Sequence, residues 1–203
     1  AVSHESDNRL VRTGVGVVTA GTLPRGLAPV RQVLDSGMVI VAKHSPVTPA
    51  VTVHASFSAG SMYDPPGQNG LAQFCSKVID RGSRERTGDQ IADALESRGV
   101  SLGITVNRHA LQLVLTCLVE DLGLALRILA DIVMHAQYPE SDVRTKRGEL
   151  ATQIRQDEDN PAAVASEAAM AALYGTAHPY GTRPRGSVES IETITRSALL
   201  AFH

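Results

Sequence analysis

The sequence predicts an α+β fold in which an antiparallel sheet packs against helices. Two observations lead to this class. Strand-like stretches come first, between residues 30 and 58, and a second pair of them follows within residues 101–118. Helical stretches surround that second pair and fill the rest of the chain, with apolar residues three and four positions apart. Strands and helices grouped in this way indicate a layered α+β domain.

The composition excludes several kinds of protein. The 203 residues are 43% hydrophobic and 20% charged, which is ordinary for a globular domain. A formal net charge of -2 argues against a nucleic-acid partner, because nucleic-acid-binding surfaces usually carry a basic excess. No apolar run reaches the roughly 18 residues that span a bilayer. We therefore expect a soluble protein without a membrane span. Its compartment stays open, with the periplasm or cell envelope as candidates for a bacterial source.

The first part of the chain predicts an arm followed by strands. Residues 1–29 show no sustained periodicity, so we expect an extended N-terminal arm. Residues 31–34 and 38–42 are strand-like and flank Gly37, which suits the tight turn of a hairpin. Residues 51–57 alternate apolar and polar side chains, which predicts a strand with one buried face.

A helix at residues 69–82 is the element around which we expect the domain to be organised. Its apolar residues have the spacing of one buried helix face: Leu71, Phe74, Cys75, Val78 and Ile79. Its polar residues lie on the opposite face, where we expect solvent: Gln73, Ser76, Lys77 and Asp80. Gln73 and Lys77 are one helical turn apart, which is the spacing of the two histidines in an H-x-x-E-H metal site.

Caps, prolines and turns predict the later elements. Residues 101–107 and 111–118 form a second predicted hairpin, and residues 120–136 a long helix. The starts of the other helices are marked, in order, by a capping box of Thr87 and Gln90, by Pro139 as a first helical residue, by Pro161 and by Ser187. The two cysteines, Cys75 and Cys117, lie on apolar faces, and we expect buried thiols rather than a disulfide.

The stretch 70–77 resembles the inverted zinc motif of the pitrilysin and insulinase family of metallopeptidases, usually Gly-Leu-Ala-His-x-x-Glu-His. This family includes the mitochondrial processing peptidase. Gly70, Leu71 and Ala72 match the start of the motif. Further matches to the family's amino-terminal domain follow in order: Gly60-Ser-x-x-Asp-Pro, Gly82 with Thr87, Asp159-Asn-Pro, His178-Pro-Tyr-Gly and Gly186-Ser-x-Glu-Ser-Ile. The resemblance implies a pitrilysin-like domain over residues 30–203. It also implies that the last strands of that domain and a second, similar domain would follow in a longer protein.

The resemblance implies four positions that carry the family's chemistry, and each holds a different residue type here. Gln73 and Lys77 stand where the two zinc-binding histidines should be, and Ser76 where the catalytic glutamate should be. The third ligand, a downstream glutamate, aligns with Gln153. Glu149, one turn earlier, leaves an alternative register open.

These replacements predict that zinc and hydrolysis are both lost. Zinc sites use thiolate, imidazole or carboxylate ligands. Lys77 at ~4 Å from a divalent cation, with an effective dielectric constant near 20, would oppose binding by on the order of 8 kcal/mol. Ser76 cannot accept a proton from water at neutral pH. We therefore expect no metal ligands, no catalytic residue and no cofactor.

The leading hypothesis is a non-catalytic, zinc-less homologue that acts as the partner subunit or peptide-binding half of a peptidase complex. Its expected partner is a catalytic pitrilysin-family subunit or a second copy of itself. Two other hypotheses stay open. One is a purely structural, core-type subunit. The other is an active zinc metalloendopeptidase whose ligands come from Glu149 and from histidines elsewhere in the chain.

Peptide binding separates these hypotheses. The resemblance implies that active relatives hold an extended peptide as an added strand, a mode in which main-chain hydrogen bonds provide the affinity. The candidate edge for such a peptide is the first arm of the second hairpin, with Gly103, Ile104, Thr105 and Val106. The alternative is that this arm is an internal strand, or an exposed one that binds nothing.

Overall fold

The computed structural model describes residues 28–45 and 47–203. The predicted N-terminal arm therefore lies outside the described residues, apart from its last two. The chain divides into two compact units, one ending at Thr48 and the other running from Pro49 to His203. The domain boundary expected at residue 30 stays a prediction.

The first unit contains the predicted hairpin. Strand β1 (Val30–Val33) pairs antiparallel with β2 (Val39–Ala42), in a register that places Val30 opposite Ala42 and Val33 opposite Val39. The turn between the strands contains Gly37, whose φ of 85° lies in the left-handed region that glycine adopts without strain. The hairpin prediction is confirmed.

The second unit contains a three-stranded antiparallel sheet. Its strands are β3 (Ala50–Phe57), β4 (Ser101–Val106) and β5 (Leu111–Leu118), in the order β3-β5-β4. The register places Val114 of β5 between His54 of β3 and Gly103 of β4. Because β5 is central, β4 lies at an edge of the sheet within the described residues. Among these residues the structure shows β4 as an edge strand and not as an internal one.

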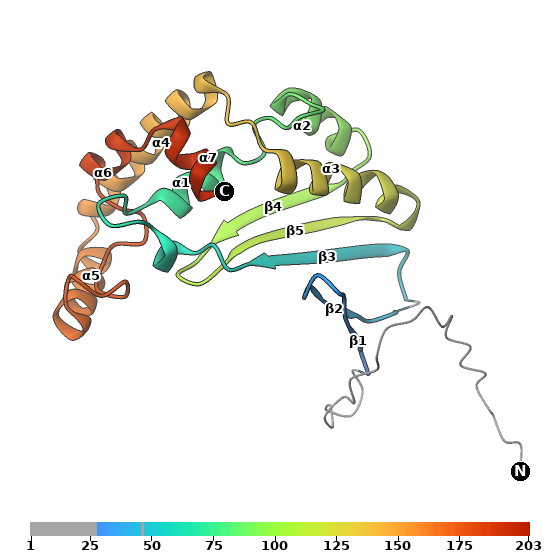
Figure 1. Ribbon diagram of the computed structural model, residues 1–203, viewed down its shortest axis with the longest axis horizontal. Helices are drawn as coiled ribbons and strands as arrows, with labels where there is room; N and C mark the ends of the chain where they lie inside the picture. The colour runs from blue at the N-terminus through green and yellow to red at the C-terminus, as the bar shows by residue number, and fades with distance from the viewer. Residues whose placement is uncertain (1–27, 46) are drawn as a thin grey trace, which may run out of the picture. The chain divides into compact units, whose positions relative to one another are not determined.

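One face of this sheet is buried and the other is not. On β5, Leu111, Leu113, Leu115 and Cys117 are buried, whereas the residues between them are half-buried. Side chains in a strand point alternately to the two faces, so this pattern marks the face on which the helices pack. Figure 1 shows these helices together on one side of the sheet. The arrangement confirms the α+β prediction.

Seven α-helices form the remainder of the described second unit: α1 (Leu71–Val78), α2 (Gly88–Glu96), α3 (Leu122–His135), α4 (Glu140–Glu158), α5 (Pro161–Tyr174), α6 (Val188–Thr193) and α7 (Arg196–Phe202). Two 3-10 turns, Ser61–Tyr63 and Val119–Asp121, precede α1 and α3. The predicted capping box of Thr87 and Gln90 is present, and Ser187 caps α6. Within the described residues, no helix is long and apolar enough to cross a membrane.

Two helix predictions need correction. Pro139 is the N-cap of α4 and not its first helical residue, since its ψ of 138° is extended. Helix α7 was not predicted, although Thr195 caps it by accepting a hydrogen bond from the backbone N–H of Ala198. Its short length of 7 residues provides fewer than two full turns of apolar spacing, which is too little for a periodicity argument.

Tyr138 joins α1, α4 and α7. It is fully buried, and its hydroxyl lies 3.1 Å from the sulfur of Cys75 on α1. Arg196 of α7 donates a 2.9 Å hydrogen bond to the Tyr138 carbonyl. The φ angle of Tyr138 is 48°, which is unusual for a residue with a side chain and carries strain. Burial raises the pKa of Cys75 to about 11. Cys75 and Cys117 are both buried and free, as predicted.

The start of α1 is capped from a distance. Its N-cap residue, Gly70, has no side chain, so the Asp64 carboxylate accepts the backbone N–H groups of Gly70 and Ala72, both at 2.8 Å. Gly70 has a φ of 94°, and a Cβ there would lie 2.5 Å from the carbonyl oxygen of Arg185. A Cβ at Gly186 would in turn overlap the carbonyl of Asn69. Two backbone segments far apart in sequence are therefore in direct contact at the beginning of α1.

We expect Asp64→Asn to change how stability depends on pH. Burial raises the pKa of Asp64 from 3.8 to about 6, although the N–H groups of Ala72 and Gly70 oppose this shift. The folded protein therefore binds this proton more tightly than the unfolded chain does, and the Asp64 contribution to the unfolding free energy falls as pH rises from about 4 to 6. Urea unfolding of both proteins across this range measures the effect. The variant should gain stability relative to the wild type as pH rises, and a constant difference would contradict the assignment.

Candidate functional site

Helices α1 and α4 carry the four positions that the family resemblance singled out, and the two helices pack side by side. On α1 the predicted apolar residues are all buried, with Phe74 and Val78 fully so. On α4, Leu150 and Ile154 are buried. Arg147 of α4 lies 5.8 Å from the ring centre of Phe74 and donates a 2.8 Å hydrogen bond to the carbonyl of Ile194. The four positions therefore lie on two helices that are packed against each other.

The polar face of α1 is less exposed than the sequence predicted. Gln73 and Lys77 are half-buried, and Ser76 is buried, with 4% of its surface accessible. The expectation of a solvated face is therefore wrong for Ser76. Its hydroxyl donates a 2.7 Å hydrogen bond to the Gln73 carbonyl of the same helix. This bond satisfies the buried hydroxyl, as is common for serine in helices.

On α4, both candidate positions for the third ligand face solvent. Gln153 is exposed, next to the buried Ile154. Glu149 is exposed as well, and its carboxylate forms an ion pair of 2.7 Å with Lys146. An exposed pair of this kind stabilises a helix by only a few tenths of a kcal/mol.

The chemistry of these side chains does not fit zinc. Gln73 and Gln153 provide neutral amides, and Lys77 provides an ammonium group, whereas zinc sites use imidazole, thiolate or carboxylate ligands. Among residues 28–45 and 47–203, no three histidine, cysteine, aspartate or glutamate side chains are grouped so that they could hold a metal ion. We therefore assign no metal-dependent step to this site.

The predicted peptide edge lies beside the same helix. Strand β4 contacts α1, and Leu102, Ile104 and Val106 pack against the core. Gly103 and Thr105 have exposed side-chain positions on the other face. An edge strand presents backbone N–H and C=O groups that can pair with another chain. The structure thus places Gly103, Ile104, Thr105 and Val106 on a strand of the type that strand addition requires.

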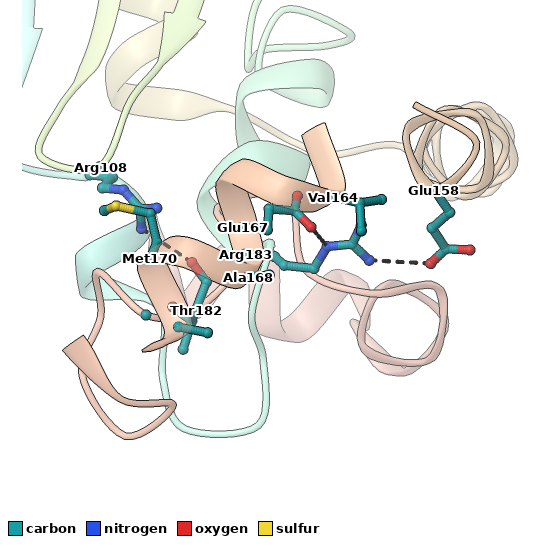
Figure 2. A pocket seen from close by; sticks show the side chains of 10 residues that line it. Arg108, Glu158, Val164, Glu167, Ala168, Met170, Thr182 and Arg183 are labelled. Carbon is teal, nitrogen blue, oxygen red and sulfur yellow. Dashed lines mark hydrogen bonds and ion pairs between the residues drawn. The ribbon is translucent and has the colours of Figure 1, made fainter. Parts of the chain in front are cut away.

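A cavity near this edge was not predicted from the sequence. It has a volume of about 520 Å³ and lies between α5 and the segment 181–183, as Figure 2 shows. Val164, Ala168 and Ala171 of α5 provide apolar lining, and Arg108 and Arg183 also line the cavity. The guanidinium of Arg183 pairs with Glu167 of α5 and, at 3.2 Å, with Glu158 of α4. Sequence spacing could not reveal this cavity, because its residues come from three separate stretches.

The histidines of the described residues have different surroundings. His135 pairs with Asp131 one turn before it, at 3.4 Å, and His44 and His54 are exposed. His109 and His178 lie in a cluster of rings near the β4–β5 turn, although they are far apart in the sequence. The sequence signal that could have indicated this cluster was the His178-Pro-Tyr-Gly match, which sequence analysis treated as a family marker without a role.

The sheet, the helix layer and the altered motif on α1 together define a domain of the zinc-metallopeptidase type. The chain belongs to the insulinase family (peptidase family M16), because its residues 39–182 match that family. The predicted resemblance and the pitrilysin-like fold are thereby confirmed.

Three known proteins show how far the similarity extends. An uncharacterised zinc protease of Mycobacterium tuberculosis is 29% identical over 183 residues, which are 87% of this chain and 40% of the relative. Mitochondrial cytochrome b-c1 complex subunit 1 of Bos taurus is 25% identical over 170 residues, or 83% of this chain and 35% of that protein. The crystal structure of a peptidase M16 inactive domain from Pseudomonas fluorescens matches with a TM-score of 0.82 and 25% identity, covering 87% of this chain and 43% of the other. The chain thus spans less than half the length of these relatives.

Restoring the family's ligands should restore zinc binding. We expect the triple variant Gln73→His, Lys77→His and Gln153→Glu to bind about one zinc ion per chain, because it supplies two imidazoles one turn apart and a carboxylate on the adjacent helix. Ser76 stays unchanged, since it is buried and the family does not use this position as a ligand. Elemental analysis after dialysis measures the metal, and circular dichroism checks the fold. A folded triple variant without zinc would show that the alignment of these positions is wrong.

A matched pair of variants tests the register on α4. The double variant Gln73→His and Lys77→His retains Gln153, so Glu149 is its remaining candidate carboxylate. If Gln153 marks the ligand position, this double variant should bind zinc weakly, and Glu149→Gln should leave the triple variant unaffected. Loss of zinc on Glu149→Gln in the triple variant would move the ligand position one turn earlier.

Proposed function

We propose that the chain is a non-catalytic, zinc-less member of the insulinase family that acts as the partner or peptide-binding half of a peptidase complex. The observation that carries this proposal is the chemistry of four side chains on α1 and α4. Gln73, Lys77 and Gln153 lack zinc-binding groups, and Ser76 is buried and hydrogen-bonded within its own helix. Neither zinc binding nor removal of a proton from water has a suitable group there.

The similarity to an inactive domain supports an inactive role. The Pseudomonas fluorescens structure is described as an inactive domain of the same family, and it matches most of this chain. The mycobacterial relative is named a zinc protease. We therefore propose that hydrolysis resides in a separate catalytic subunit of the family, and that this chain pairs with that subunit or with a second copy of itself.

The proposed contribution of the chain is to hold an extended peptide. Strand β4 is an edge strand, and its backbone can form main-chain hydrogen bonds with an added strand. This mode needs little sequence preference from Gly103, Ile104, Thr105 or Val106, because the backbone forms the bonds. Leu102, Ile104 and Val106 pack against the core, which holds the edge in a fixed position.

A purely structural, core-type role is the second candidate. It is favoured by the 25% identity to mitochondrial cytochrome b-c1 complex subunit 1 over 83% of this chain. In this case the fold would serve assembly, and the β4 edge would be covered by a neighbouring subunit or left without a ligand.

Peptide binding by the isolated chain distinguishes the two roles. We expect a fluorescent peptide of about eight serine, threonine and valine residues to bind saturably, which anisotropy measures, and to remain intact by mass spectrometry. Two versions of the peptide carry N-methyl groups on alternate residues, in opposite phase. One phase removes the N–H groups that face β4 and should abolish binding, whereas the other should bind normally. Equal effects of both phases, or no binding at all, would favour the structural role.

A test of activity completes the comparison. Co-expression with an H-x-x-E-H subunit of the family should yield a complex that elutes as one species and cleaves the peptide faster than the catalytic subunit does alone. Stoichiometric zinc together with peptide cleavage by this chain alone would refute the proposal.

A further inference from the structure

Four aromatic rings gather where β4 turns into β5. Tyr174 stacks on His178, with ring centres 5.5 Å apart and an interplanar angle of 20°. Tyr180 lies within 5.3 Å of Tyr174 and 5.7 Å of His178, measured between ring centres. Its hydroxyl is 2.6 Å from the Nε2 atom of His109 in the β4–β5 turn. We call these residues, Tyr174, His178, Tyr180 and His109, the ring platform.

The loop that carries His178 and Tyr180 of the ring platform has a closely packed backbone. A Cβ at Gly181 would overlap the carbonyl of Gly175, so the two ends of the loop touch through their backbones. Within the loop, the backbone N–H of Tyr180 donates a 3.1 Å hydrogen bond to His178 Nδ1. Rings held on such a loop lose little conformational freedom on binding, which favours affinity.

Arg108 fixes this loop to the end of the sheet. Its guanidinium donates hydrogen bonds to the carbonyls of Pro179, at 2.9 Å, and Thr182, at 3.2 Å. The same group lies 5.2 Å from the ring centre of Tyr180. Since Arg108 follows β4 by two residues, the ring platform is held next to the end of the proposed peptide edge.

Three of the four rings of the platform are exposed, and Tyr180 is half-buried. Tyr174 is 45% exposed, and His109 and His178 are exposed as well. The chain contains four tyrosines and no tryptophan, and two of these tyrosines lie in this cluster. Exposed aromatic side chains held in one position are typical of binding surfaces, because they offer a large contact area with few rotatable bonds.

The position of the ring platform suits a peptide that continues past β4. A strand advances about 3.4 Å per residue, so two residues beyond Val106 bring an added peptide to the level of the β4–β5 turn. There it would meet Arg108, for which the described residues provide no ion-pair partner. This positive charge disfavours a lysine or arginine of the peptide, whereas an uncharged aromatic side chain can stack on the exposed rings.

We propose that the ring platform binds an aromatic side chain of the extended peptide that pairs with β4. This inference rests on the proposed function and deepens it. Strand pairing would provide affinity for any extended peptide, and the ring platform would select peptides with an aromatic residue at one position near the end of the bound segment.

The absence of tryptophan from the chain permits a direct test. One tryptophan is placed in turn at each position of the serine, threonine and valine peptide, and the dissociation constant and emission maximum are measured against alanine at the same position. At one terminal position, tryptophan should tighten binding about threefold to tenfold and shift its emission to shorter wavelength. At the other positions the effect should stay within about twofold, and lysine at the selected position should weaken binding.

Variants of the chain test whether Tyr174 is responsible for the preference for tryptophan. Tyr174→Ala should reduce the preference for tryptophan to less than about twofold, whereas Tyr174→Phe, which keeps the ring, should retain it. Leu173→Ala is the matched control, because Leu173 is the neighbouring residue on α5 and is 72% exposed. Thermal unfolding of each variant verifies the fold.

The outcomes separate the inference from the proposed function. If no peptide binds, or if N-methylation in both phases has the same effect, the proposed function fails. If peptides bind in the expected phase but tryptophan gives no advantage at any position, or an advantage that Tyr174→Ala leaves intact, the role of the ring platform is refuted. An effect of Leu173→Ala equal to that of Tyr174→Ala would also refute it, because it would indicate general apolar adhesion.

Discussion

The burial of one face of α1 is the constraint on which the rest of the domain depends. Leu71, Phe74, Cys75, Val78 and Ile79 each have at most 2% of their surface exposed. Each large apolar side chain buried in this way stabilises the fold by about 1.5–3 kcal/mol before the loss of conformational entropy is subtracted. This packing places no requirement on Gln73 or Lys77. The fold can therefore keep the helix in the family's position while the residues on its polar face vary.

The contacts that hold α1 in place likewise involve residues outside the motif. Tyr138 joins the buried face of α1 to α7, and Asp64 satisfies the backbone groups at its beginning. None of these contacts uses the motif positions. The motif side chains can therefore differ between members of the family without loss of these contacts. This explains how a fold so similar to that of the Pseudomonas fluorescens domain can be combined with an altered motif.

Sequence reasoning predicted the elements that have a strong local signal. The 3.6-residue period of α1, the capping box at Thr87 and the glycine turn at Gly37 are determined by neighbours in the chain, and the structure contains all three. Sequence reasoning failed where contacts between distant segments of the chain determine the burial or grouping of a residue. Ser76 is buried because other elements cover it, and the cluster around Tyr180 combines residues about 70 positions apart. The four altered positions were identified through family resemblance. The sequence alone predicted the helix but not its chemistry.

The contact between Gly70 and Arg185 has a consequence for how the domain forms. Ser190 strengthens the same junction by donating a 2.7 Å hydrogen bond to the carbonyl of Asn69, across 121 positions of the chain. Contacts so distant in sequence form late, since a long loop must close before they contribute. During synthesis the beginning of α1 therefore lacks this support until α6 has left the ribosome.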